Sequence, residues 1–356
     1  MTDSATTTPA QTWRIAFLRR RFSPTGGAER YLLRLASGLA SQGHPITLYC
    51  EEWSPRENPF QAIRKIESND PVSYAQKVMA QPLRDRHDII FSLERLAGAD
   101  LYRAGDGLHA DWLAHRHSFS PIRGRIRTAL RSKNAQLCRL EAKIFTPKGV
   151  KRVICNSRFV ADQIIKRFQF PADRIDLVYN GVPYQQFSMG DRALGRKALK
   201  LTEDDYVILL VGAGAERKGH AIAWEAMRRL RNPKARLVIV DSPPSVAMPH
   251  IYAAADVFLL PTLYDPFANV TLEALAAGLP VITSSQNGAS EIIENEENGF
   301  ILPRANDVKR IVALLETLAL PENRAAFYQP ARALAQKHDL ARNLNETLEV
   351  FKKLRK

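Results

Sequence analysis

Cysteine is scarce in this sequence. The 356 residues include three cysteines, Cys50, Cys138 and Cys155, which lie far apart and form no C-x-x-C pair. Because the number is small and odd, a disulfide framework is excluded as the main support of the fold, and the spacing matches no common zinc site. Such cysteine usage is typical of a reducing compartment, so we expect a cytoplasmic protein.

Long apolar segments are also missing. No apolar run approaches the roughly 20 residues that a helix needs to cross a bilayer, so no membrane-spanning helix is expected. Residues 1–12 are polar and rich in threonine, which predicts a disordered tail and not a signal peptide. No internal repeat is visible. At this length the chain has room for two domains of ordinary size, each with its own core.

Acidic residues are in the minority. The sequence holds 51 Lys+Arg and 37 Asp+Glu, a formal net charge of +14. Residues 1–184 carry 29 basic and 17 acidic residues, whereas the remainder carries 22 and 20. The first half is therefore expected to meet an anionic partner. Nucleic acid, an acidic membrane and a phosphorylated substrate are all compatible with the charge alone.

The chain opens with the order strand, glycine turn, helix, strand. An apolar strand at residues 14–18 leads to Gly26-Gly27, a helix follows to about Gln42, and residues 46–50 form the next strand. This order is typical of a Rossmann-like domain, although the G-x-G-x-x-G fingerprint of dinucleotide-binding proteins is absent. Paired glycines allow a sugar or a phosphate to approach the backbone closely.

Two cations follow the first strand of the second half. Residues 206–212 form an apolar strand that ends at Gly212, and Arg217-Lys218-Gly219 precedes a helix from His220 to about Leu230. Open α/β sheets bind their ligands at the carboxyl ends of their strands. An arginine fork beside a lysine point charge at such a turn suits a diphosphate.

A helix start follows the next buried strand. The strand at residues 257–260 leads to Asp265-Pro266 and then to a helix from about Asn269 to Ala277, which Gly278 ends. The N–H groups of residues 267–270 lack intrahelical partners and lie at the positive end of the helix dipole. Such a helix start is a phosphate site. The sequence therefore predicts a second element that binds phosphate.

These segments together resemble the motifs of retaining glycosyltransferases of family 4. Asp265 and Glu273 are separated by seven positions, as the two motif acids of the family are, and residues 274–281 match its Ala-x-x-x-Gly-x-Pro-Val pattern. The first acid is Asp where the family more often has Glu. Three further segments also match, namely Gly26-Gly27-Ala28-Glu29-Arg30, Asn180-Gly181-Val182 and Arg217-Lys218-Gly219.

The resemblance implies the GT-B architecture, an α/β fold in which two Rossmann-like domains face a central cleft. Residues 13–184 would form an acceptor-side domain that also faces the membrane. Residues 185–338 would form the domain that binds the nucleotide sugar. Residues 339–356 would form a C-terminal helix that returns to the first domain.

For the donor, a nucleoside-diphosphate sugar, the resemblance implies specific roles. Arg217 and Lys218 would neutralise the departing diphosphate, Glu273 would hold the ribose and Asp265 the donor sugar. Further donor contacts are expected from Gly26, Gly27, Gly212, Phe267, Ala268, Asn269 and Val270. The implied reaction is hexosyl transfer with retention at the anomeric carbon. No D-x-D segment occurs, so neither a metal nor another cofactor is expected.

For the acceptor, residues 100–106 resemble the Asp-x-Tyr-x-Ala-x-Asp segment of lipopolysaccharide core glucosyltransferases. The resemblance places the closing acid, Asp106, in the cleft near the reacting sugar. His109 and Glu29 are expected on the same acceptor side. The implied acceptor is lipid-linked or belongs to the lipopolysaccharide core.

A basic stretch lies between these segments. Residues 112–152 hold eleven Lys+Arg and one acid, Glu141, around apolar residues at near-helical spacing. A basic helix with an apolar stripe is typical of a peripheral contact with an anionic membrane. The expected contacts are Trp112, Arg123, Arg125, Arg127, Arg131 and Lys133. The alternative is that the stripe packs on its own sheet while the charges are merely solvated.

The chain departs from the family pattern at residues 241–250. Family members usually have a helix and a strand here, and Ser242-Pro243-Pro244-Ser245 can form neither. The missing loop would hold the nucleotide base, so a catalytically silent sugar-nucleotide-binding protein is an alternative. A sugar-nucleotide epimerase on the same architecture is another. A nucleic-acid-binding protein is suggested only by charge, and no recognition motif supports it.

Overall fold

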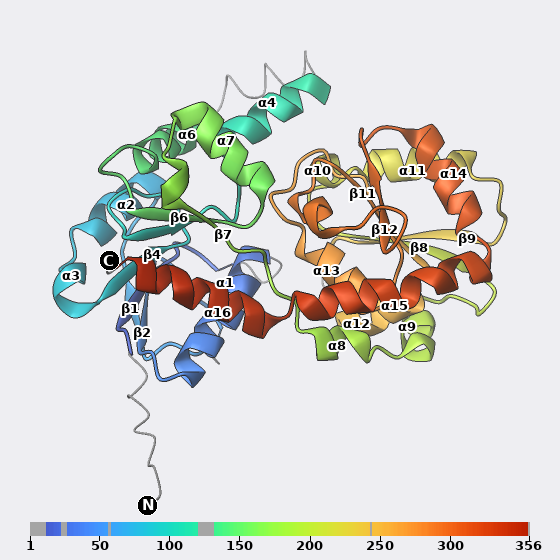
Figure 1. The fold of residues 1–356 in the computed structure, drawn as a ribbon, viewed down its shortest axis with the longest axis horizontal. Coiled ribbons are helices and arrows are strands. Elements are labelled where there is room, and N and C mark those ends of the chain that lie inside the picture. The colour runs from blue at the N-terminus through green and yellow to red at the C-terminus, as the bar shows by residue number, and fades with distance from the viewer. Residues whose placement is uncertain (1–11, 23–26, 56–57, 120–131, 243, 355–356) are drawn as a thin grey trace, which may run out of the picture.

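The computed structural model describes residues 12–22, 27–55, 58–119, 132–242 and 244–354. It contains two parallel β-sheets, one of seven strands and one of five. Helices flank both sheets, and the two α/β units lie side by side (Figure 1). This is the fold class that the sequence predicts.

The first sheet has the strand order β3-β2-β1-β4-β5-β6-β7. Because β2 and β4 both pair with β1 on opposite sides, the order of the sheet reverses at β1, and a crevice opens there at the carboxyl ends of the strands. The strands are β1 Ile15–Leu18, β2 Ile46–Cys50, β3 Ala62–Lys65, β4 Ile89–Ser92, β5 Leu101–Arg103, β6 Arg152–Cys155 and β7 Ile175–Leu177.

Most helices of the first unit bury one apolar face. In the first of them Leu32, Leu35 and Leu39 recur at helical spacing and lie in the core beneath the sheet. Another begins at Pro71, where Asp70 accepts hydrogen bonds from two first-turn amides. The helices are α1 Gly27–Ser41, α2 Pro71–Met79, α3 Leu83–Arg86, α4 His109–Phe119, α6 Ser132–Ile144 and α7 Arg158–Phe168.

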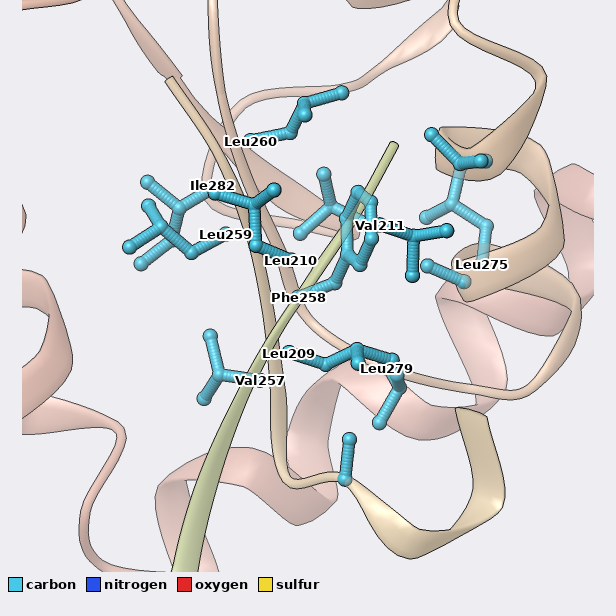
Figure 2. Packing of buried hydrophobic residues seen from close by; sticks show 14 of the residues in the cluster. Leu209, Leu210, Val211, Val257, Phe258, Leu259, Leu260, Leu275, Leu279 and Ile282 are labelled. Carbon is cyan, nitrogen blue, oxygen red and sulfur yellow. The ribbon is translucent and has the colours of Figure 1, made fainter. Parts of the chain in front are cut away.

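The second sheet has the order β12-β11-β10-β8-β9. Figure 2 shows the side chains of its central strands around Phe258, with Leu275 of a covering helix beside it. Leu259 points to the opposite face because successive strand residues alternate. The strands are β8 Tyr206–Val211, β9 Ala235–Val240, β10 Val257–Leu260, β11 Val281–Ser284 and β12 Gly299–Leu302.

The helices of the second unit follow the strands in the expected alternation. The helix that the sequence predicts from about Asn269 begins at that residue, and the one predicted at His220 begins there as well. The helices are α8 Tyr184–Ser188, α9 Arg192–Ala198, α10 Ala215–Lys218, α11 His220–Arg229, α12 Met248–Ala254, α13 Asn269–Ala276, α14 Val308–Thr317 and α15 Pro321–Lys337.

The connection after β9 is short, as the sequence predicts. Among the described residues, which leave out residue 243, one helix, α12, and no strand separate β9 from β10. No strand therefore pairs with the outer edge of β9 in the described part of the chain. The segment that family members usually have here is missing from the fold.

The last helix, α16 Leu340–Lys353, packs back on the first unit. In Figure 1 it lies beside α1, although α15 before it belongs to the second unit. Phe351 is fully buried and contacts Trp13 and Phe91 edge to face, with ring centroids 6.0 and 5.7 Å apart. The predicted return of the C-terminal helix is confirmed.

The basic stretch lies only partly within the described residues. Arg123, Arg125, Arg127 and Arg131 fall outside them, and so does the side chain of Lys133. The described end of the stripe, Leu140 and Ile144 on α6, is buried in the core of the first unit. This end of the stripe therefore packs on its own domain, as in the alternative to membrane binding that the sequence leaves open. No described helix is both long enough and apolar enough to traverse a bilayer.

Candidate active site

A cavity of about 520 Å³ lies between the two units. Residues that follow the carboxyl ends of strands in both sheets line it, including Asp106 after β5, Asn156 after β6 and Gly212 after β8. Both sheets therefore place their ligand-binding edges on one shared cleft.

In the wall of this cavity Lys218 and Asp265 form a buried ion pair, which the partly exposed Arg217 joins. Oδ2 of Asp265 lies 2.7 Å from Nη1 of Arg217 and 2.8 Å from Nζ of Lys218. Burial alone would raise the pKa of Asp265, but the two cations outweigh it and hold that pKa below its usual range. The carboxylate is therefore ionised at neutral pH and binds both cations.

The cations are held in place by their backbone. The carbonyl oxygen of Arg217 accepts hydrogen bonds from the amide of Leu263 and the hydroxyl of Thr262, both 2.8 Å long, which tie α10 to the segment before α13. Gly212 has a φ of 139°, and a Cβ there would lie 2.8 Å from Cε of Lys218. Only glycine leaves room for the lysine at this turn.

The start of α13 faces the same cavity. Phe267, Ala268, Asn269 and Val270 all line it, together with Arg217 and Lys218. The amide of Ala268 already donates to Oδ1 of Asn287, at 3.0 Å, so that one N–H group of the predicted set has a partner. The cations and the helix start nevertheless share one hollow, as the sequence predicts.

Glu273 lies elsewhere. It is 1% exposed and is absent from the cavity wall, because its position on α13 points it toward α12 and α1. Its Oε2 accepts a hydrogen bond of 2.9 Å from Tyr252, and its Oε1 lies 4.0 Å from Arg34 of the first unit. Glu273, which we expected to hold the ribose, is therefore not among the residues that line the cleft.

The first unit contributes an acid to the opposite wall. Asp106 lies 3.2 Å from Nη1 of Arg19 and 3.9 Å from Nη1 of Arg95. Burial opposes ionisation, but the two arginines outweigh it and hold the pKa of Asp106 below its usual range. Glu29, by contrast, does not line the cavity, since its carboxylate is buried against Arg19 at 2.7 Å. Glu29 orients the arginine that holds Asp106.

Comparison with known proteins identifies the family. The model of Glycosyltransferase Family 4 matches residues 25–186, and that of Glycosyl transferases group 1 matches residues 242–334. The chain belongs to the glycosyltransferases that combine a family 4 domain with a group 1 domain. It is therefore a glycosyltransferase with the GT-B fold, and the architecture predicted from the motifs is confirmed.

This glycosyltransferase has relatives over most of its length. It is 24% identical to the lipopolysaccharide glucosyltransferase WaaG of Escherichia coli, over 92% of the chain and 95% of WaaG. The crystal structure of WaaG superposes with a TM-score of 0.78, at 22% identity, over 95% of this chain and 99% of that one. An uncharacterised glycosyltransferase of Methanocaldococcus jannaschii is 29% identical, but the match covers 44% of the chain and only 48% of the archaeal protein.

A further structure carries a ligand. HepE of Anabaena, solved in complex with UDP-glucose, superposes with a TM-score of 0.74 at 17% identity, over 96% of this chain and all of that one. At this level of identity the likeness concerns the fold. It places this glycosyltransferase among GT-B structures, one of which holds a nucleotide sugar.

His109 and Trp112 of the glycosyltransferase both line the cleft from α4. The indole of Trp112 lies 6.1 Å from the ring of Tyr264 across the domain boundary, so this residue faces the cavity and not a membrane. Burial lowers the pKa of His109, whose Nε2 lies 3.1 Å from Oδ1 of Asn134. Glu141, the lone acid of the basic stretch, caps α4 by accepting from the amide of His109 at 2.7 Å.

Several residues of the cavity were not predicted from the sequence, and three of them are buried polar residues that end or follow a strand. Arg103, Asn156 and Asn180 each lie at or just after the end of a strand of the first sheet, and all are at most 5% exposed. A charged or amide residue that ends an apolar strand is the signal that could have found them. Gly27, which lines the cavity, was predicted, whereas Gly26 lies outside the described residues.

Proposed function

We propose that this glycosyltransferase transfers a hexose from a nucleoside-diphosphate sugar to a lipid-linked or lipopolysaccharide-core acceptor, with retention at the anomeric carbon. The observation that carries the proposal is the convergence of Arg217, Lys218 and the start of α13 on one cavity between the domains. The full-length similarity to WaaG favours the acceptor class.

In the proposed mechanism the protein supplies charge where the diphosphate departs. Arg217 and Lys218 release part of their contact with Asp265 and bind the phosphoryl oxygens, while the free amides at the start of α13 donate to the same group. The leaving phosphate accepts the proton of the acceptor hydroxyl, so no carboxylate nucleophile is required. Asp106, ionised beside Arg19, faces the positive charge that develops on the sugar.

The two cations also fill the role that a divalent metal has in other transferases. We therefore propose transfer without a metal or another cofactor, and activity should survive a chelator. Among the described residues, no group of three or more His, Cys, Asp or Glu side chains has the arrangement of a metal site.

Lys218→Ala tests the donor site. We expect turnover with the productive donor, found by a thermal-shift screen of sugar nucleotides, to fall at least tenfold, which is about 1.4 kcal/mol in the barrier. Lys234→Ala, at an exposed lysine of the same domain, is the matched control and should keep full turnover. Unchanged turnover in Lys218→Ala would remove the proposed site.

We further propose that the enzyme is cytoplasmic and binds the inner face of the membrane through the basic stretch of the first domain. Binding to vesicles should require anionic lipid and weaken as salt rises, because exposed charges are screened over about 10 Å at 0.1 M salt. Co-sedimentation with phosphatidylglycerol and with phosphatidylcholine vesicles measures this. Equal binding to both would contradict the electrostatic part of the proposal.

A catalytically silent sugar-nucleotide-binding protein is the second candidate. The short connection between β9 and β10 favours it, since the loop that would hold the base is missing. Slow hydrolysis of the donor without acceptor separates the two, because a binding protein releases no nucleoside diphosphate. The transferase is supported if the unaltered chain releases the nucleoside diphosphate and Lys218→Ala abolishes this release.

A further inference from the structure

Arg103 is a buried cation with an unused hydrogen-bond donor. It ends β5, is 3% exposed and lines the cleft. Its guanidinium lies 3.7 Å above the ring of Tyr31 and donates to Oδ1 of Asn180. Its Nη1 has no hydrogen-bond partner, and no carboxylate of the described residues lies within 4.0 Å of it. Among the cations of the cleft, Arg217, Lys218 and Arg95 do pair with acids.

Asn156 lies beside it with an unused acceptor. The residue follows β6, is 1% exposed and lines the same cavity. Its Nδ2 donates to the carbonyl oxygen of Gly105 at 3.2 Å, which fixes the orientation of the amide because a flip would set two oxygens against each other. Its Oδ1 has no partner. Gly105 touches both residues, since a Cβ there would lie 3.5 Å from Nε of Arg103.

Unpartnered buried polar atoms are rare because leaving water without a new hydrogen bond is unfavourable. Two of them, one donor and one acceptor, belong to Arg103 and Asn156, and both residues line one cavity. A ligand that completes them must offer an anionic or neutral oxygen to Arg103 and an O–H group to Asn156. A buried guanidinium favours the anion when no carboxylate is in contact with it, and Asp106 acts on Arg103 only as a more distant charge.

We propose that Arg103 and Asn156 form a subsite for an acceptor sugar that carries a carboxylate or phosphate next to a free hydroxyl. The anion binds Nη1 of Arg103, and the hydroxyl donates to Oδ1 of Asn156. The inference rests on the proposed function, because it takes the first-domain wall as the acceptor side. The diphosphate group of the donor, taken by itself, offers acceptors only and would leave Oδ1 of Asn156 unpaired.

Calorimetry on the full chain tests the subsite with defined probes. Inorganic pyrophosphate is present throughout to occupy the diphosphate positions. The probes are glucose 6-phosphate, glucuronate, glucose and inorganic phosphate. At least one anionic sugar should bind tenfold or more tightly than both glucose and inorganic phosphate, and the comparison of the two anionic sugars tells which anion is recognised. If neither anionic sugar binds more tightly than glucose, or if inorganic phosphate binds as tightly as the better of the two, the proposal is overturned.

Variants separate charge from hydroxyl recognition. Arg103→Gln should reduce the preference for the anionic sugar over glucose to about one, and Arg103→Lys should keep most of it. Asn156→Leu should weaken the binding of the anionic sugar and of glucose by the same factor. Arg64→Gln, an exposed arginine of the same sheet, is the matched control and should bind as the unaltered chain does. A preference that persists in Arg103→Gln would refute the assignment.

One further measurement distinguishes the subsite from the donor site. Arg103→Gln should leave the affinity for pyrophosphate alone unchanged within twofold, and a tenfold loss would place Arg103 in the donor site and overturn the inference. Lys218→Ala should lose pyrophosphate binding. If Lys218→Ala still binds pyrophosphate, the proposed function fails. The preference for an anionic sugar would then still test the subsite by itself.

Discussion

At the scale of single residues, Asp265 holds the two cations that we propose for the donor diphosphate. Its carboxylate sits on Arg217 and Lys218, the two cations assigned to the donor. Lys218 is 6% exposed, so without this acid its charge would be buried without a partner until a donor binds. The family position is more often Glu, and the shorter Asp here still reaches both cations.

Asp265→Asn should therefore destabilise the empty enzyme. We expect the free energy of unfolding to fall by about 3 kcal/mol, as when one partner of a buried ion pair is removed. Saturating pyrophosphate should restore part of the loss, because it supplies the missing negative charge. Urea denaturation with and without pyrophosphate measures both effects.

Glu349→Gln is the control, because its pair with Lys352 is exposed on both sides and should add little stability. If Asp265→Asn unfolded at the same urea concentration as the unaltered chain, the acid would not be balancing the buried charge.

At the scale of elements, helix α7 is capped from the other domain. Its own Ser157 accepts from the amide of Val160, while the carboxylate of Glu291 accepts from Arg158 at 2.8 Å and Phe159 at 2.6 Å. Tyr179 donates to the same carboxylate at 3.0 Å. A negative charge at a helix start is favourable, so the start of α7 holds the second domain against the first.

Glu291→Ala should release these first-turn amides. A cap of this kind contributes about 1 kcal/mol, so amide exchange at Arg158 and Phe159 should become about fivefold faster. Hydrogen exchange followed by mass spectrometry or NMR measures it. Glu294→Ala, an exposed glutamate of the same segment, should change nothing. Equal exchange in both variants would show that the carboxylate does not hold the helix.

At the scale of the whole molecule, the chain crosses between the domains twice and the crossings are bonded together. The amide of Val182 donates to the carbonyl oxygen of His338 at 3.0 Å. The His338 ring is 8% exposed, with Nδ1 3.1 Å from Nη1 of Arg342. Burial, assisted by Arg342, lowers the pKa of His338 to about 4. The folded protein therefore keeps this ring neutral.

This depressed pKa makes the fold sensitive to acid. The unfolded chain protonates His338 near pH 6.5 and the folded one near pH 4, so stability is fully present above about 6.5 and is lost as the pH falls toward 4. Between pH 7 and pH 5 we expect a loss of about 2 kcal/mol that His338→Gln does not show. Urea titrations of both proteins at the two pH values test it. The same loss in the variant would assign the acid sensitivity to other groups.

Much of the fold could be predicted from the sequence because its causes are local. The helix at Asn269 and the strand at residues 257–260 follow from apolar spacing and from breakers such as Gly278 and Pro280, which act on their immediate neighbours. The missing strand after Val240 was predicted for the same reason. Short strands with few apolar residues, such as β3, give no such signal and were not predicted.

The site was only partly predictable. Arg217, Lys218 and residues 267–270 lie in motifs, and they do meet in the cleft. Glu29 and Glu273 lie in the same motifs, yet each is buried outside the cavity wall, against Arg19 and Tyr252. A motif fixes which residues are close in sequence, but the direction of each side chain depends on what packs around it.

By itself, the sequence determined the α/β class, the alternation of strands and helices and the places of the cation turn and the helix start that we propose for the diphosphate, because hydrogen bonding, capping and periodic burial act within a few residues. Only the tertiary structure decided which polar groups share the cleft and which of them lack partners. Arg103, Asn156 and Trp112 come from separate elements, and the order of parallel strands brings them to one edge. Their chemistry depends on neighbours far away in the chain, and no local pattern records those neighbours.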